Sequence, residues 1–269
     1  MKAVASDMIV PLHKHPYSTS ECVDEVLYGM VVEILEDCGT WVHVQTAYRY
    51  KGYCLKEKLL INEGKAGQWD KEAKHVIIQN FADILAEPKI QSAKIATFVK
   101  GSSISLVEDS SLNPEWVKVK LVNGEIGYSR SYWIRERIVE LDSEEAFREN
   151  VVQTALSYLK APYRWGGKSP LGIDCSGLCS MAYMLNGVYI YRDAQIVEGF
   201  PIKEIPFEKI QKGDLLYFPG HIAMYMGNGL YVHSSLGGNE VSINSLNEKD
   251  SNYRKDLATS ITAVGSLFG

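Results

Sequence analysis

One cysteine of this chain lies where it could act as a nucleophile. Cys175 occurs in the segment GIDCSGLC, directly before the apolar run LCSMAYML, which is typical of a helix. A cysteine in the first turn of a helix lies near free backbone N–H groups and the positive end of the helix dipole, and both favour the thiolate. The same N–H groups could stabilise an oxyanion on a substrate carbonyl. We therefore predict that Cys175 is a nucleophile, and that Cys179, one turn later, is a buried apolar residue.

A cysteine nucleophile needs a base, and histidine supplies one most often. Of the six histidines, only His221 and His233 belong to the same part of the chain as Cys175. They flank the sequence GNG at residues 227–229, which predicts the turn of a hairpin. If these residues form a three-residue loop, His233 faces Ala223, and the two histidines are diagonal neighbours about 7 Å apart on one face. A two-residue loop would put them on opposite faces.

The types of these three side chains allow two kinds of site. We take His221 as the general base for Cys175 and His233 as the residue that orients its imidazole. In this arrangement no metal ion or other cofactor takes part, and we expect none. Zinc bound by the same Cys and His residues is the alternative, because catalytic zinc sites use three protein ligands of these types.

Two segments of the N-terminal half repeat at a constant offset of 75 residues, in the pairs Trp41/Trp116, Val44/Val119, Gly52/Gly127 and Tyr53/Tyr128. In each copy a Trp-Val-x-Val alternation predicts a half-buried strand, followed by a turn and a second strand that begins at Gly-Tyr. We predict two small β-barrels of one kind, at residues 1–66 and 67–141. Two unrelated amphipathic hairpins are the alternative.

The pattern changes after the second copy. Residues 142–145, DSEE, have the form of a helix cap with acidic residues in the first turn. Apolar residues then recur at steps of four, at Phe147, Val151, Ala155 and Leu159. They predict a helix that begins near residue 143 and ends at residues 161–162, before a second helix that begins at the cysteine. Strand-like segments follow at residues 214–218, 221–226, 230–235 and 241–246, so we expect an α+β domain over residues 142–269.

The composition limits the partners and the compartment. The formal net charge is −5 without a basic block, so we expect no nucleic-acid partner. The N-terminal segment lacks the apolar core of a signal peptide, and no stretch approaches the about 20 apolar residues of a membrane span, so we expect a cytoplasmic monomer without a membrane partner. A chain whose signal peptide had been removed would look the same, which leaves an extracytoplasmic location open.

The five cysteines are odd in number and include no CxxC pair. This argues against a disulfide framework and against a structural zinc site.

Four motifs resemble a known family. The segments APYRWGGKSPLGIDCSGL, GDLLYF, GHIAMYMGNG and YVHSS occur in the order typical of the NlpC/P60 family of papain-like cysteine peptidases, over residues 143–269. The repeated units resemble bacterial SH3-like domains, and the whole resembles the YkfC-type subgroup of γ-D-glutamyl-L-diamino acid endopeptidases. This resemblance implies hydrolysis between D-glutamate and diaminopimelate or lysine in murein-derived peptides with a free N-terminal L-alanine. The sequence does not distinguish the two diamino acids.

The resemblance also implies roles for residues of the third domain. Cys175, His221 and His233 match the nucleophile, the base and the third polar residue. Side chains expected to contact or line the substrate cleft are Tyr163, whose hydroxyl would help to bind the oxyanion, Trp165, Asp174, Ser176 and Asp193, the last on the diamino-acid side.

The first SH3-like domain is expected to contribute to the same cleft. The resemblance implies that Glu21 and Tyr50 contact the ammonium group of the substrate, with Asp24 and Glu25 as alternatives to Glu21. The carboxylates of Asp174 and Glu21, if they hold the ammonium group inside a cleft, would be left desolvated and unpaired by a peptide with a blocked N-terminus. Free stem peptides are therefore the expected substrates.

Two other functions stay open. The chain could be a wall-binding module whose SH3-like units attach to murein while the third domain is a degenerate scaffold, although the complete Cys/His/His set favours an enzyme. It could also keep the nucleophile and act as a murein amidase or acyltransferase.

Overall fold

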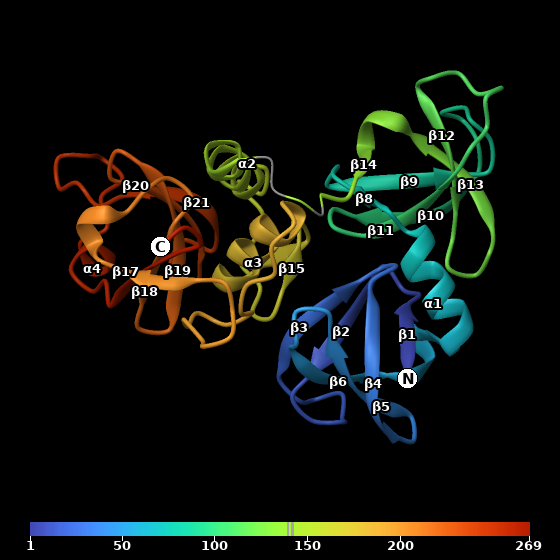
Figure 1. Ribbon diagram of the computed structural model, residues 1–269, viewed down its shortest axis with the longest axis horizontal. Coiled ribbons are helices and arrows are strands. Elements are labelled where there is room, and N and C mark those ends of the chain that lie inside the picture. The colour runs from blue at the N-terminus through green and yellow to red at the C-terminus, as the bar shows by residue number, and fades with distance from the viewer. Residues whose placement is uncertain (139, 141–142) are drawn as a thin grey trace. The chain divides into compact units, whose positions relative to one another are not determined.

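A computed structural model describes residues 1–138, 140 and 143–269 (Figure 1). The chain divides into two compact units, Met1–Arg137 and Ile138–Gly269. The predicted domain boundary between residues 141 and 142 and the predicted cap residue Asp142 lie outside the described residues. Among the described helices, none combines the length and the apolar character that a bilayer crossing requires.

The first unit begins with a seven-stranded antiparallel sheet of order β3-β2-β6-β5-β4-β1-β7. Its strands are β1 (Lys2–Ala5), β2 (Ile9–His13), β3 (Cys22–Leu27), β4 (Val31–Cys38), β5 (Trp41–Thr46), β6 (Lys51–Leu55) and β7 (Leu59–Ile61), with a short 3-10 helix at Lys56–Lys58. Alternate residues of β5, namely Val42, Val44 and Thr46, are buried, as the Trp-Val-x-Val pattern predicts.

A second sheet repeats this topology, with the order β10-β9-β13-β12-β11-β8-β14. Its strands are β8 (His75–Ile77), β9 (Phe81–Leu85), β10 (Lys94–Val99), β11 (Ser103–Val107), β12 (Trp116–Lys120), β13 (Ile126–Arg130) and β14 (Ile134–Glu136), with a 3-10 helix at Ser131–Trp133. Trp41 and Trp116 each begin a strand, and Gly52 and Gly127 are each the second residue of the next. The predicted repeat is therefore confirmed, and the alternative of unrelated hairpins is wrong.

Neither SH3-like sheet is a closed barrel. Closure requires hydrogen bonds between the two outermost strands, and among the described strands β3 does not pair with β7, nor β10 with β14. The three-residue strand β7 pairs only with β1. The sequence predicted small β-barrels. The strands form where the pattern indicates them, but the pattern carried no information on the pairing of the edge strands, and the barrels are not closed.

The repeated glycine has a steric role in both sheets. A Cβ atom at Gly127 of β13 would collide with Cγ2 of Ile84 on β9, and one at Gly52 of β6 would lie 2.9 Å from Cβ of Leu12 on β2. Real Cβ atoms do not approach other heavy atoms this closely. The glycine therefore permits the close crossing of two strands, and this explains its place in each repeat.

We expect Gly127→Ala to lower the free energy of unfolding by about 1–3 kcal/mol, the range typical of overpacking, as measured by urea denaturation. Gly67→Ala is the control. Gly67 lies in a helix, where an added Cβ meets nothing within 4 Å, so this substitution should stabilise by about 0.5–1 kcal/mol. Equal effects of the two substitutions would contradict the tight crossing.

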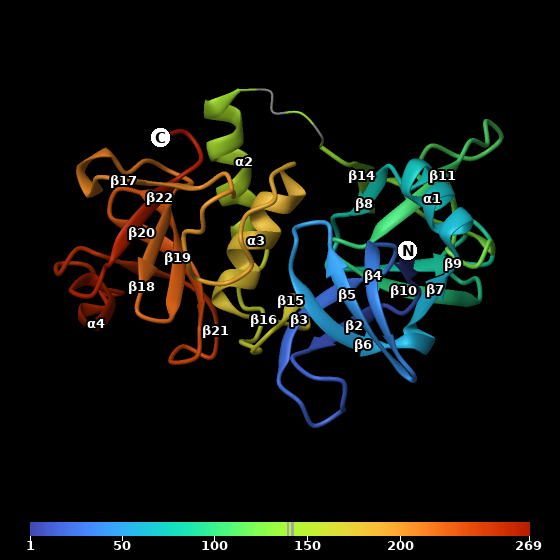
Figure 2. The same cartoon turned by 60° about the horizontal axis from the view of Figure 1, so that its bottom comes forward.

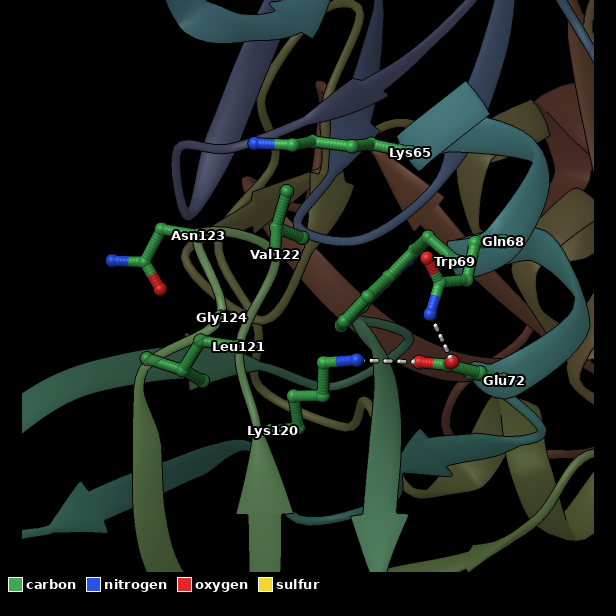
Figure 3. A pocket seen from close by; sticks show the side chains of 9 residues that line it. All are labelled: Lys65, Gln68, Trp69, Glu72, Lys120, Leu121, Val122, Asn123 and Gly124. Carbon is green, nitrogen blue, oxygen red and sulfur yellow. Dashed lines mark hydrogen bonds and ion pairs between the residues drawn. The ribbon is translucent and has the colours of Figure 1, made fainter. Parts of the chain in front are cut away.

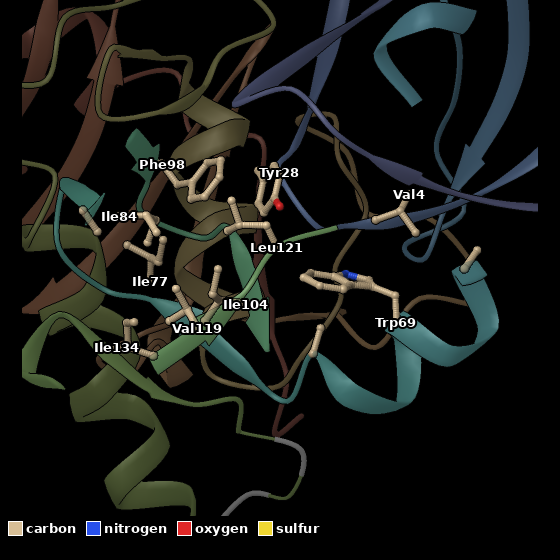
Figure 4. Close-up of a cluster of buried hydrophobic side chains, with 13 residues drawn as sticks. Val4, Tyr28, Trp69, Ile77, Ile84, Phe98, Ile104, Val119, Leu121 and Ile134 are labelled. Atoms are coloured by element: carbon tan, nitrogen blue, oxygen red, sulfur yellow. The ribbon is translucent and has the colours of Figure 1, made fainter. Parts of the chain in front are cut away.

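Helix α1 (Glu63–Glu72) joins the two sheets, and its Trp69 is buried between them. The Trp69 indole donates a hydrogen bond of 2.8 Å to the Gly29 carbonyl. Tyr28 of the first half stacks on Phe98 of the second, with ring centroids 3.7 Å apart. Figure 4 shows these aromatic rings in one apolar cluster. The two sheets share this core, and the predicted division at residues 66/67 falls inside α1 and stays a prediction.

A small cavity of about 150 Å³ lies beside α1 in this unit. Its lining is formed by Lys65, Gln68, Trp69, Glu72 and residues 120–124. Inside it Glu72 accepts hydrogen bonds from Lys120, at 2.8 Å, and from Gln68, at 2.7 Å (Figure 3). None of the predicted site residues lines this cavity.

The second unit is an α+β domain, as predicted. Its six-stranded antiparallel sheet has the order β17-β22-β18-β19-β20-β21. The strands are β17 (Lys203–Ile205), β18 (Leu215–Phe218), β19 (His221–Gly227), β20 (Leu230–Ser235), β21 (Glu240–Ser245) and β22 (Ala263–Ser266). The other elements are helices α2 (Glu144–Leu156), α3 (Cys175–Leu185) and α4 (Lys255–Ala258), the two-residue strands β15 (Lys168–Ser169) and β16 (Gly172–Ile173), and a 3-10 helix at Phe207–Lys209.

Helix α2 is shorter than the apolar periodicity predicts. Its N-cap is Ser143, whose side chain accepts a hydrogen bond from the Ala146 N–H. The helix ends at Leu156, and Lys160 adopts a positive φ of 69°. Leu159 is 41% exposed, so the last predicted apolar position does not face the core. A residue with positive φ cannot continue a right-handed helix, and the chain turns here toward the loop that precedes α3.

Candidate active site

Cys175 is the first residue of α3, as the sequence predicts. The helix begins there because the Asp174 carboxylate caps it, accepting a hydrogen bond of 2.6 Å from the Gly177 N–H. Gly177 also lets the preceding loop approach the helix, since a Cβ at this position would collide with the Gly167 carbonyl. Helix α3 lies against β19 and β20 (Figure 2), and Cys179, one turn after Cys175, is fully buried.

The two predicted histidines meet on one face of the sheet. In the β19–β20 hairpin Met224 faces Val232 and Tyr225 faces Tyr231, and a bulge follows toward the turn. The loop itself has two residues, Asn228 and Gly229, because Gly227 pairs with Leu230, and the bulge before it gives the register expected of a three-residue loop. The histidines are therefore diagonal neighbours on one face, as predicted, but the loop length on which that prediction depended is wrong. The Nε2 atom of His221 lies 2.8 Å from Nδ1 of His233, and both rings meet edge to face.

A third polar side chain, which sequence reasoning missed, continues this row. Asn244 of β21 places its Oδ1 atom 2.9 Å from Nε2 of His233. The strand pairing puts His233 opposite Ser242, so Asn244 is a diagonal neighbour of His233. Its signal in the sequence was the polar alternation of Ser242 and Asn244 on the strand next to that of His233.

Cys175 is protonated at neutral pH in this structure. Burial of the thiol raises its pKa to about 11, and the Asp174 charge acts in the same direction. Hydrogen bonds from the backbone N–H groups of Ile222 and Ser176 act against this rise in pKa, as does the charge of Arg192. The sequence predicted a thiolate favoured by the helix terminus. That expectation is corrected here, because desolvation of the sulfur is the larger effect.

The histidines are neutral at pH 7. Burial lowers the pKa of His221 to about 4, and the charges of His233 and Arg254 add to this effect. Burial likewise lowers the pKa of His233 to about 4, although the hydrogen bond with Asn244 acts to raise it. A neutral imidazole can accept the thiol proton. The sulfur hydrogen-bonds the N–H of Ile222, the residue after His221, so the thiol lies against the start of β19.

These pKa values predict the acid limb of the pH–rate profile. His221 must be unprotonated to act as a base, and its lowered pKa keeps it so down to about pH 4. We therefore expect kcat/KM, which reports ionisations of the free enzyme, to stay constant from about pH 7 to about pH 5 and to reach half its maximum near pH 4. Steady-state rates, with circular dichroism to verify folding, provide the measurement. A midpoint near pH 6.5 would contradict it.

Asp174 and Ser176 form a buried network with Arg192, which is 1% exposed. The guanidinium donates to both carboxylate oxygens of Asp174, each at 3.0 Å, and to the Ser176 hydroxyl at 2.8 Å. The carboxylate also accepts hydrogen bonds from the N–H groups of Gly166 and Gly177. Protein donors therefore occupy the Asp174 oxygens. The sequence assigned Asp174 and Ser176 to substrate contacts, which stays a prediction, and it missed their structural partner Arg192.

Three further predicted residues belong to the same unit. Tyr163 is half-buried, and burial raises the pKa of its hydroxyl to about 12. Trp165 is 61% exposed. Asp193 hydrogen-bonds Tyr191. The backbone of Tyr163 pairs with that of Ile173, two residues before the nucleophile. The role of the Tyr163 hydroxyl and the substrate contacts of Trp165 and Asp193 stay predictions.

Glu21 and Tyr50, predicted to bind the substrate amine, lie in the first unit. Glu21 precedes β3 and pairs with Lys14 at 3.3 Å. Of its alternatives, Asp24 is fully buried and accepts a hydrogen bond from the Tyr48 hydroxyl. Glu21 and Tyr50 belong to the first unit and Cys175 to the second, and the role of Glu21 and Tyr50 in the cleft stays a prediction.

The zinc alternative finds no support in the geometry. In the described part of the chain, no three His, Cys, Asp or Glu side chains are grouped so that they could hold a metal ion. The lone pair on Nδ1 of His233 is directed to Nε2 of His221, so His233 does not offer this atom to a metal.

Comparison with known proteins identifies the family. Residues 160–259 match the NlpC/P60 family. Dipeptidyl-peptidase 6 of Lysinibacillus sphaericus is 60% identical over 271 residues, which is 100% of both chains. The γ-D-glutamyl-L-lysine dipeptidyl-peptidase of Bacillus cereus is 26% identical over 241 residues, covering 83% of this chain and 70% of that protein.

A solved structure has the same fold. The crystal structure of an NlpC/P60 family protein from Bacillus cereus matches with a TM-score of 0.78 and 20% identity, over 98% of both chains. Together with the full-length similarity to a named peptidase and with the cysteine at the start of α3, these findings show that the chain is a cysteine peptidase and belongs to the NlpC/P60 family.

Proposed function

We propose that this peptidase hydrolyses the bond between γ-D-glutamate and the diamino acid, diaminopimelate or lysine, of murein stem peptides with a free N-terminal L-alanine. The observation that carries the proposal is the 60% identity, over the full length, to a protein named Dipeptidyl-peptidase 6. A second relative is named for cleavage at γ-D-glutamyl-L-lysine. Release of an N-terminal dipeptide from such a peptide gives L-Ala-γ-D-Glu.

The geometry supports a thioester mechanism with Cys175, His221 and His233 as the catalytic residues. His221 takes the thiol proton while Cys175 Sγ attacks the γ-carbonyl carbon of D-glutamate. The C–N bond then breaks, and His221 returns the proton to the departing amine of the diamino acid. Water, deprotonated by His221, attacks the thioester and releases the dipeptide acid and the free thiol. The Cys175 N–H and the Tyr163 hydroxyl are the proposed donors to the oxyanion.

Selection for a free N-terminus is assigned to acidic residues outside the catalytic unit. Glu21, which is exposed, and Tyr50 remain our candidates for the ammonium contact. Asp24 is a weaker candidate because its carboxylate is already engaged with Tyr48. Within the second unit, Trp165 offers an exposed aromatic face to a substrate.

We place the enzyme, a monomer, in the cytoplasm. The described cysteines are not recorded in disulfides. Cysteines outside disulfides are typical of reducing compartments, which supports this location. Peptides released from murein would then reach the enzyme as free stem peptides rather than as part of the wall.

The test uses synthetic L-Ala-γ-D-Glu-L-Lys and its diaminopimelate counterpart, each with a free and with an acetylated N-terminus. Mass spectrometry should detect L-Ala-γ-D-Glu from the free peptides, and acetylation should suppress cleavage at least about tenfold, since it removes the ammonium charge and with it the charge-assisted hydrogen bonds to the enzyme. Release of an intact stem peptide from a muropeptide would instead support an amidase. Sedimentation with sacculi without any cleavage would support a wall-binding protein.

A further inference from the structure

A row of hydrogen-bonded side chains crosses three neighbouring strands of the catalytic sheet. It runs from His221 on β19 to His233 on β20, over 2.8 Å, and from there to Asn244 on β21, over 2.9 Å. His233 is fully buried, so water cannot replace these partners. Each ring nitrogen in the row must therefore be a donor or an acceptor toward a known neighbour.

A backbone carbonyl at the far end of the row determines which atom donates and which accepts in each of its hydrogen bonds. The side-chain amide of Asn244 donates a hydrogen bond of 2.8 Å from Nδ2 to the carbonyl oxygen of Asn252. A carbonyl oxygen can only accept, so the atom of Asn244 that faces it must be the NH2 group. The Asn244 Oδ1 atom, also an acceptor, is thereby directed to His233.

The Asn252 carbonyl is itself held in place. It accepts a second hydrogen bond from the Ser245 N–H at 3.1 Å, and the Asn252 side chain donates to the Ile243 carbonyl at 3.2 Å. A rotation of the Asn244 amide would bring two acceptors together and would lose the hydrogen bond to His233. This anchored carbonyl therefore excludes the flipped amide.

The tautomers of both histidines follow from this direction. Because Asn244 offers an acceptor, His233 carries its proton on Nε2 and presents an unprotonated Nδ1 to His221. His221 must then carry its proton on Nε2, which leaves the lone pair on its Nδ1 atom. That atom is the one not engaged in the row and is available for the thiol proton.

We infer that Asn244 is a positioning residue that fixes the Nε2–H tautomers of His233 and His221 and so keeps the Nδ1 atom of His221 basic toward Cys175. The inference rests on the proposed function, which makes His221 the base. Asn244 touches neither the sulfur nor the substrate. It acts through the two rings, as an orienting residue does in a hydrolytic triad.

Two substitutions separate this role from a structural one. Asn244→Leu keeps the size of the side chain and removes its hydrogen bonds with His233, the Asn252 carbonyl and the Ser242 hydroxyl. Asn244→Asp keeps an acceptor toward His233 but places an oxygen against the Asn252 carbonyl. We expect Asn244→Leu to lower kcat about 10- to 100-fold, within the contribution of general-base catalysis, with KM changed less than about twofold. Asn244→Asp should retain more activity than Asn244→Leu. The control Asn247→Ala removes an exposed amide just after β21 and should leave kcat unchanged.

Nitrogen-15 NMR of the histidine rings reads the tautomers directly and needs no substrate. The native protein should show both His221 and His233 as Nε2–H tautomers, and Asn244→Leu should show a mixture. An Nδ1–H tautomer on either ring of the native protein would overturn the inference, as would unchanged tautomers and kcat in the folded Asn244→Leu variant. If the tautomers are as expected but the stem peptides are not cleaved, the proposed function fails and the inference on Asn244 stands.

Discussion

Cys175→Ala is expected to reduce kcat on a γ-D-glutamyl peptide by about 10⁴-fold or more, since removal of a nucleophile abolishes the covalent route. The substitution removes one sulfur atom at the first residue of α3 and leaves the Asp174 cap in place. Unfolding should therefore stay cooperative, with a stability close to that of the native protein. Steady-state assays and thermal unfolding of the same preparation provide the two measurements.

Cys179→Ala is the matched control, one turn further along the same helix. Cys179 is fully buried, and burial raises the pKa of its thiol. Its loss should destabilise the protein by about 1 kcal/mol through a small cavity and leave kcat within about twofold. Substantial activity in Cys175→Ala, or equal losses in both variants, would contradict the assignment of the nucleophile.

Arg192→Met is expected to lower the free energy of unfolding by about 3–5 kcal/mol, the range for breaking a buried ion pair from one side. The guanidinium is 1% exposed and donates to both oxygens of Asp174, which is itself 6% exposed. Methionine is of similar length but leaves this carboxylate buried without a charged partner. Because Asp174 also caps α3, which begins with the nucleophile, kcat should fall as well. Chemical denaturation measures the change in the free energy of unfolding.

Two further variants test the cause of this loss. Asp174→Asn in the Arg192→Met background replaces the unpaired carboxylate by a neutral amide and should recover part of the stability. Arg254→Met breaks the pair of Arg254 with Asp256, whose side chains are 31% and 61% exposed, and should change stability by less than about 1 kcal/mol. Similar losses in Arg192→Met and Arg254→Met would show that burial of the pair is not the cause.

The sequence predicted local features of this protein well. The cysteine at the start of α3 follows from a short polar segment before an apolar run. The hairpin that carries His221 and His233 follows from the GNG turn, although a bulge in β19, and not the length of the turn, places both on one face. The tandem SH3-like sheets follow from a constant offset between Trp41 and Trp116. In each case the residues that carry the signal are close in the sequence or repeat at one period.

Interactions between distant segments were not predictable in this way. Arg192 reaches Asp174 from 18 positions away, and nothing in the local pattern around either residue indicates their contact. The pairing of β20 with β21, which brings Asn244 to His233, depends on the strand order of the whole sheet. The protonation of the thiol depends on burial by several elements, which the helix position of Cys175 alone does not determine.

Interception of the acyl-enzyme tests the central claim most directly. Hydroxylamine is added during turnover of L-Ala-γ-D-Glu-L-Lys, and the products are separated by mass spectrometry. A thioester on Cys175 should react with hydroxylamine in competition with water, so a hydroxamate of L-Ala-γ-D-Glu should form with the native enzyme and not with Cys175→Ala. Cleavage that gives only the free acid at every hydroxylamine concentration, or a hydroxamate from Cys175→Ala, would contradict a thioester mechanism at this residue.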